Sequence, residues 1–162
     1  MIKNFTFLLL LSFVSLYSTA QTCTATSAPT LIYKTPTYIT GTGTGAGTLN
    51  AQYRFSNVTN ATPATTDVIV TITQLLNATL VNIDDDASNP GTANNFQPVV
   101  NTNANSTGYV KFDFSFVVAG TTNPFTQNCI NFTALDIDGA TGVKEKVTVF
   151  DASGGQLSAA TN

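Results

Sequence analysis

The chain has 162 residues, of which 43% are hydrophobic, and this length suffices for one globular domain with a core but not for two ordinary ones. Six Lys and Arg residues stand against nine Asp and Glu residues, so no basic surface can neutralise phosphates and nucleic acid is excluded as a partner. The absence of histidine excludes most chemistry that needs an imidazole, including a Ser-His-Asp arrangement.

The N-terminus has the pattern of a secretory signal peptide. Lys3 supplies a positive charge, residues 5–16 form a short apolar run, and Ser18-Thr19-Ala20 fits a small-residue cleavage site. The apolar run is short for a membrane anchor, and no later segment is apolar enough to span a bilayer. We therefore expect residues 1–20 to be removed and the protein to be secreted or held at the extracellular cell surface.

Residues 21–50 are rich in Thr, Gly, Ser and Pro, with glycine at every second position from Gly41 to Gly47. This composition predicts a linker or an edge segment. The glycine run is not a phosphate-binding loop, because it lacks the Lys and the Ser or Thr that end such a loop. From residue 51 onward the apolar pattern changes to period two, so residues 51–162 are assigned to one β-domain.

The clearest predicted strand covers residues 110–118. Large apolar residues occupy every second place there, with Lys111, Asp113 and Ser115 between them. Shorter patterns of the same kind occupy residues 53–55, 67–73, 79–83, 130–137 and 146–150. No window has a helical apolar stripe, so the fold class is all-β. The strand spacing predicts an antiparallel β-sandwich of the jelly-roll or immunoglobulin-like type.

The two cysteines, Cys23 and Cys129, are candidates for a disulfide bridge. Bridging is favoured in an oxidising compartment, and this bridge would close most of the mature chain into one loop. In the chain-entropy model such a loop stabilises the fold by roughly 4 to 5 kcal/mol. Two unpaired cysteines are the alternative that the sequence leaves open.

The acidic residues fall into clusters that suggest a structural calcium site. Asp136 and Asp138 project to the same side of a predicted strand, where two carboxylates repel each other unless a cation compensates. Calcium prefers oxygen ligands such as these. The candidate ligands are Asp84, Asp85, Asp86, Asp136, Asp138 and Glu145. The alternative is that these residues are solvated turn formers, because Asp side chains bond readily to nearby backbone in turns.

Two other kinds of site have candidate residues in the sequence. A glycoside hydrolase needs two carboxylates across a cleft, and nothing selects a pair among Asp113, Asp136 and Glu145. A carbohydrate-binding module needs exposed aromatic rings, and the candidates are Tyr33, Tyr38, Tyr53, Tyr109 and Phe125. The alternative is that the Phe residues fill the core with the Tyr residues at its margins; these Phe residues are Phe55, Phe112, Phe114, Phe116 and Phe132.

Four segments taken in order, residues 53–58, 82–85, 108–112 and 134–145, resemble a module of large secreted surface proteins of Bacteroidetes. The shared core is an aromatic-x-aromatic strand, then D-I-D-G, then E-x-V. The resemblance implies a β-sandwich building block of adhesins and cell-envelope proteins, without a catalytic role. It also implies that Asp136, Asp138 and Glu145 hold cation-binding or turn-stabilising positions.

The chain ends soon after Val147-Thr148-Val149, where this pattern leads us to expect further strands and domains. We therefore expect either a part of a larger multidomain protein or a sandwich that is incomplete at its C-terminus, with an open edge for a partner strand. The predicted function is a secreted or cell-surface, non-enzymatic adhesion or structural module, stabilised by calcium, with a surface glycan or protein as ligand. A carbohydrate-binding module is the alternative, and a glycoside hydrolase-like enzyme is the third hypothesis.

Overall fold

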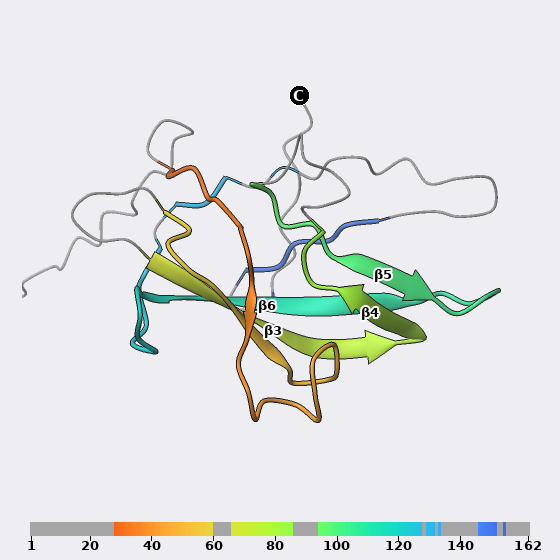
Figure 1. Cartoon of the computed structure of the whole chain (residues 1–162). Coiled ribbons are helices and arrows are strands. Elements are labelled where there is room, and N and C mark those ends of the chain that lie inside the picture. The colour runs from red at the N-terminus through yellow and green to blue at the C-terminus, as the bar shows by residue number, and fades with distance from the viewer. Residues whose placement is uncertain are drawn as a thin grey trace, which may run out of the picture.

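The structure is a computed structural model that describes residues 28–59, 66–85, 94–127, 129–131, 133, 146–151 and 154 (Figure 1). The strands in this part of the chain are β1 (Thr37–Tyr38), β2 (Gln52–Phe55), β3 (Thr66–Leu76), β4 (Ala78–Asn82), β5 (Val99–Thr102) and β6 (Tyr109–Val118). All the strand pairs are antiparallel, and the described residues contain no helix, so the predicted all-β class is confirmed. Accordingly, no helix in these ranges could cross a membrane.

The strands form a four-stranded sheet in the order β1-β2-β3-β6 and a two-stranded sheet of β4 and β5. The predicted strands at 67–73, 79–83 and 110–118 correspond to β3, β4 and β6, whereas β1 and β5 were not predicted. Residues 146–149 form no strand, so the strand predicted at 146–150 is wrong. Most of the strand predicted at 130–137 lies outside the described residues, as do residues 1–27.

The long strands β3 and β6 carry opposite chemistry on their two faces because strand side chains alternate. The register places Phe55, Val68 and Phe116 in one row across the sheet, and Tyr53, Val70 and Phe114 in the next. We call this apolar side the inner face. The intervening residues form the outer face, which consists of Gln52, Arg54, Asp67, Ile69, Thr71, Asp113, Ser115 and Val117.

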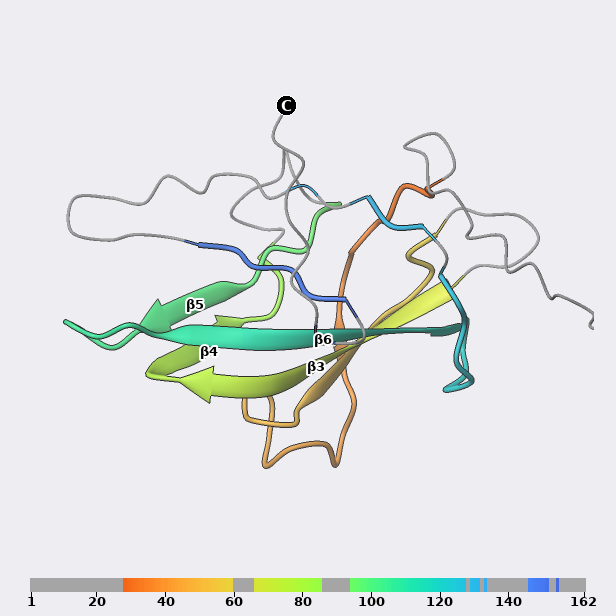
Figure 2. The same ribbon diagram turned by 180° about the vertical axis from the view of Figure 1, so that it is seen from behind.

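The core lies on the inner face, where a second layer covers it. Leu80 of β4 and Ile83 belong to the same buried cluster as Phe55 and the inner-face residues of β3. The segments around Tyr33 and Asn94 complete the cover. They are joined by a bond in which the backbone N–H of Tyr33 donates to the carbonyl of Asn94 at 2.9 Å. Figures 1 and 2 show β4 and β5 beside β6, with the segment before β1 crossing the strands farther along. A sandwich of two full sheets stays a prediction.

Aromatic rings hold this cover on the sheet. Phe96 packs edge-on against Phe112 and Phe114, with ring centroids 5.2 and 5.1 Å apart. Tyr33 packs edge-on against Phe55 at 5.3 Å. Such edge-to-face pairs contribute about 0.5 to 1.5 kcal/mol beyond the area that they bury. The alternation of Phe along β6 therefore supplies the surface on which the second layer sits.

The chain passes between the two sheets at a corner around Asn77. This residue has a φ of 44° and separates β3 from β4, so the chain leaves one sheet and enters the other within a single residue. Its carbonyl accepts the N–H of Asn103 at 2.8 Å, and its side-chain amide donates to the carbonyl of Thr107 at 3.2 Å. Gly108 lies so close that an added Cβ would be 2.5 Å from the Asn77 carbonyl oxygen.

Residues 40–50 connect β1 to β2 as a series of turns. Gly41, Gly43 and Gly47 adopt positive φ values of 86°, 60° and 74°, a region that glycine enters at little cost. The loop is attached to the sheet at its base, because the N–H of Asn50 donates to the carbonyl of Ile72 at 2.8 Å. Residues 40–50, part of the segment predicted as a linker or an edge, are therefore the loop of the β1–β2 hairpin at the edge of the sheet.

After β6 the chain turns back along the edge of the sheet. Gly120 takes a φ of 73° in the turn, and residues 123–125 then run antiparallel to the end of β6. The N–H of Val118 donates to the carbonyl of Asn123, and the N–H of Phe125 donates to the carbonyl of Phe116, both at 2.9 Å. We call residues 119–125 the return segment.

Candidate functional site

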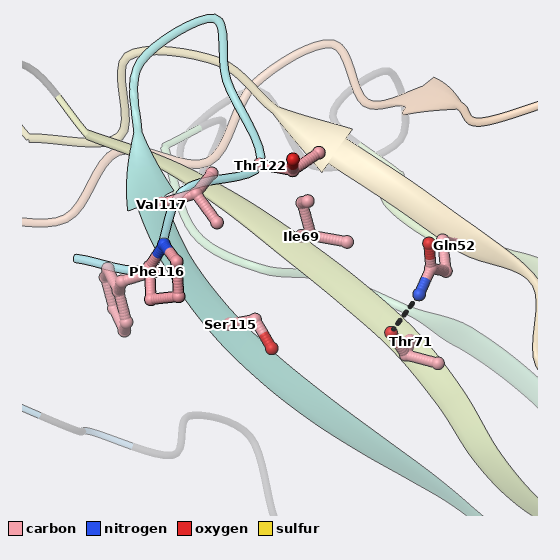
Figure 3. Close-up of a pocket in the computed structure, with 8 residues that line it drawn as sticks. Gln52, Ile69, Thr71, Ser115, Phe116, Val117 and Thr122 are labelled. Atoms are coloured by element: carbon pink, nitrogen blue, oxygen red, sulfur yellow. Dashed lines mark hydrogen bonds between the residues drawn. The ribbon is translucent and has the colours of Figure 1, made fainter. Parts of the chain in front are cut away.

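A groove crosses the outer face of the four-stranded sheet and is the candidate binding site (Figure 3). Its volume is about 400 Å³, which lies within the range of about 300 to 1,000 Å³ typical of small-molecule sites. Strands β2, β3 and β6 form the floor, and the return segment forms one wall. The lining residues are Gln52, Ile69, Thr71, Ser115, Val117, Thr122 and Pro124, together with Phe116, whose register position is on the inner face.

Uncharged polar groups supply the hydrogen-bonding capacity of the groove. The register aligns Gln52 with Thr71 on the neighbouring strand, and the Gln52 amide donates to the Thr71 hydroxyl at 3.3 Å. Ser115 lies beside Ile69 in the next row, and Thr122 reaches the groove from the return segment. One amide and three hydroxyls therefore converge on a space whose other lining residues are apolar.

Asp67 holds one end of the outer face together. Its carboxylate accepts the Arg54 guanidinium at 2.7 Å and the backbone N–H groups of Asn57 and Gly120, each at 2.9 Å. The Asp67 side chain is 2% exposed and that of Arg54 is 21% exposed. These bonds join the end of β2, the start of β3 and the return segment, so Asp67 fixes the wall of the groove relative to its floor.

The same contacts explain the acidity of Asp67. Burial alone acts to raise the pKa of this carboxyl group, because it penalises the charged form. The two backbone donors and the Arg54 guanidinium outweigh burial, and the net effect lowers the pKa below its ordinary value of 3.8. Asp67 is therefore an ionised structural group.

Asp113, one of the carboxylates considered for hydrolysis, also lies on the outer face. It aligns with Thr71 in the register, and its carboxylate accepts the Thr73 hydroxyl at 3.3 Å. The Lys111 ammonium lies 3.8 Å from the same oxygen. Its partners in the hydrolase hypothesis, Asp136 and Glu145, lie outside the described residues.

Two of the six candidate calcium ligands are described. Asp84 is buried and accepts the backbone N–H of Gln97 at 3.0 Å, while the N–H of Asp85 donates to the Gln97 carbonyl at 3.0 Å. Both residues thus attach the end of β4 to the segment before β5. Asp86, Asp136, Asp138 and Glu145 lie outside the described residues. Within the described ranges no three acidic or cysteine side chains gather in a metal-binding group.

The tyrosines considered for sugar stacking belong largely to the core. Tyr33 packs among Phe rings, and burial raises the pKa of its hydroxyl to about 12. Tyr53 is buried and its hydroxyl accepts the N–H of Gly47 at 2.6 Å. Tyr38 packs on Tyr53 and donates its hydroxyl proton to the carbonyl of Thr42. Tyr109 is exposed, so the predicted platform is not assembled from these four residues.

Cys129 is buried, and its predicted partner Cys23 lies outside the described residues, as does Phe132. Sequence alone did not single out the groove residues Gln52, Thr71 and Thr122. Gln52 and Thr71 stand at alternating polar positions of their strands, but the sequence does not show which strands pair, and the pairing of β3 with β2 and β6 brings the polar rows together. Thr122 has no such periodic signal, because it follows β6 in the return segment.

No family model, no curated protein and no solved structure matches this chain. The residues and their geometry are therefore the basis for assigning a function.

Proposed function

We propose that this protein is a non-enzymatic module of the extracellular surface that mediates adhesion through the outer face of its four-stranded sheet. The observation that carries the proposal is the groove of uncharged polar side chains on the strands β2, β3 and β6. Binding sites gain specificity from a few polar groups placed by a firm scaffold, and this groove has that composition.

The scaffold beneath the groove supports this role. β3 and β6 pair along almost their whole lengths, and aromatic packing on the inner face backs both strands. Asp67 accepts bonds from Arg54, Asn57 and Gly120, and the bond from Gly120 fixes the return segment against the sheet. The backbone of paired strands is already ordered, so ligand binding orders little further backbone, which favours affinity.

Export and stabilisation are parts of the same proposal. The N-terminal pattern supports secretion, and the resemblance to surface-protein modules supports membership of a larger multidomain protein. A bridge between Cys23 and Cys129 would stabilise the exported chain, and the burial of Cys129 is in keeping with it. Calcium would be held by Asp84, Asp85, Asp86, Asp136, Asp138 and Glu145.

The adhesive role is tested by attachment under flow. Beads coated with the secreted protein are passed over immobilised mucin, collagen and bacterial envelope material, and heat-unfolded protein on identical beads serves as the control. We expect folded protein to hold beads on at least one surface at a density several-fold above the control. Equal densities on every surface would contradict an adhesive role.

The calcium component is tested by melting. We expect the melting temperature in calcium to fall when a chelator is added in excess, because a ligand that binds only the folded state stabilises it. An unchanged melting temperature would remove calcium from the proposal and leave the acidic residues as turn formers.

A further inference from the structure

We propose that the groove on the outer face binds a neutral sugar unit of a glycan. This inference rests on the proposed adhesive function and names the ligand class for the same site.

The lining residues favour a neutral ligand. Gln52, Thr71, Ser115 and Thr122 carry hydroxyl or amide groups, and none of the eight lining residues is ionisable in the ordinary pH range. The charged neighbours on the same face are already paired, Arg54 with Asp67 at 2.7 Å and Asp113 with Lys111 at 3.8 Å. An anionic or cationic ligand would lose hydration here without gaining an opposite charge.

The mixed polarity of the groove matches a sugar ring. Hydroxyl and amide side chains can both donate and accept, and the hydroxyl groups of a sugar require both. Pro124 supplies exposed aliphatic surface in the same groove, against which the C–H face of a ring can lie, whereas the lining residues Ile69 and Val117 are buried. The polar groups come from three neighbouring strands, which lie about 4.8 Å apart, so they can reach several hydroxyls of one ring.

An extended peptide fits the groove less well. Peptides that join sheets bind to an exposed edge, where unpaired backbone groups are available. The floor of this groove consists of β3 between β2 and β6, so the backbone of β3 is bonded to both neighbours. A ligand on this face meets side chains only, which suits the side-chain recognition of hydroxyl groups.

The test uses NMR titration of the isotope-labelled secreted protein. The neutral probes are cellohexaose, maltohexaose, mannohexaose and N-acetylchitohexaose; hexagalacturonic acid and a hexathreonine peptide represent anionic glycans and peptides. We expect at least one neutral probe to shift amide signals of Thr71, Ser115 and Thr122 in a saturable manner. Ser115→Leu fills the groove and should weaken that binding at least tenfold.

Thr79→Leu is the matched control, because Thr79 is an exposed Thr on β4 in the other sheet. It should bind as the original protein does, and equal melting temperatures will show that both variants fold. The proposal is overturned if no neutral probe binds, if only the anionic probe or the peptide binds, or if Ser115→Leu binds unchanged. Bead attachment that persists in any of these cases would leave the adhesive function standing with a different ligand.

Discussion

The two faces of the four-stranded sheet are built from the same strands but serve different purposes. On the inner face, Phe55 and its row neighbours are covered by a second layer of aromatic and aliphatic side chains. On the outer face, Thr71 and Ser115 face a groove open to solvent. Burial energy is therefore concentrated on one side, and the other side can carry a binding surface at small cost in stability.

The largest loss of stability is expected for a substitution on the inner face. Phe55→Ala removes a ring that is 0% exposed and that packs on Tyr33 and Phe96. The free energy of unfolding should fall by about 3 to 5 kcal/mol, because a buried Phe loses both its transfer energy and its packing. Urea denaturation measures this loss.

Phe114→Ala on the same face is the comparison, since this ring is 41% exposed. It should cost clearly less than Phe55→Ala. A loss below about 1 kcal/mol for Phe55→Ala would show that the second layer does not depend on this ring.

The next largest loss of stability is expected at Asp67, which carries a buried charge on the outer face. Asp67→Asn removes the negative charge and places an amide among donors from Arg54, Asn57 and Gly120. We expect a loss of about 3 kcal/mol, the scale for leaving a buried charge without its partner. Asp113→Asn, at an exposed pair with Lys111, is the matched control and should cost less than about 1 kcal/mol.

The same group makes stability depend on pH. Its pKa in the folded protein lies below the ordinary 3.8, so the folded state favours the ionised form. The stabilisation is present above the ordinary value and is lost as the pH falls through the lower folded value. Melting between pH 6 and pH 2 should show a decline that is shallower in Asp67→Asn. Parallel curves for the two proteins would refute this assignment.

A smaller effect tests the corner that keeps the second layer over the inner face. Gly108→Ala would place a Cβ 2.5 Å from the carbonyl oxygen of Asn77, and the backbone must shift to admit it. We expect a loss of about 2 kcal/mol, typical of an overpacked site. The exposed neighbour Thr107 provides the control, because Thr107→Ala retains the backbone carbonyl that accepts the Asn77 amide. Equal stabilities for the two variants would mean that the corner adapts freely.

The smallest loss of stability is expected for a substitution in the groove on the outer face. Ser115→Ala removes an exposed hydroxyl from the groove and should change the free energy of unfolding by no more than about 0.5 kcal/mol. A chemical denaturation curve that coincides with that of the original protein is the expected result. A loss above about 1 kcal/mol would show that the groove hydroxyls also contribute to the stability of the fold.

The strand that sequence alone predicted most closely is β6, whose alternation is uninterrupted. β6 was predicted as residues 110–118 and observed as Tyr109–Val118. β3 was predicted to stop at residue 73 and continues to Leu76, because the register shifts between Ile72 and Gln74 and the alternation changes phase there. β5 has only Val99 and Val100 as apolar residues, which is too short a run to show a period.

The candidate site was harder to predict than the fold. Its polar residues are spread over β2, β3, β6 and the return segment, and only the order of strands in the sheet brings them together. From sequence alone, the clustered acidic residues and the tyrosines were instead the candidates for binding sites. Tyr53 is a core residue, because the loop before β2 covers it, and Tyr33, in the segment before β1, packs on Phe55 at the margin of the core.

The return segment also limits the addition of further strands at this edge of the sheet. Asn123 and Phe125 direct their backbone groups toward β6, so Pro124 between them faces outward. Proline has no N–H, and a further strand arriving at this position would find no donor to pair with. Sheet edges that lack donors resist the addition of strands from other molecules. Pro124 alone thereby hinders copies of the chain from joining into fibres along this part of the edge.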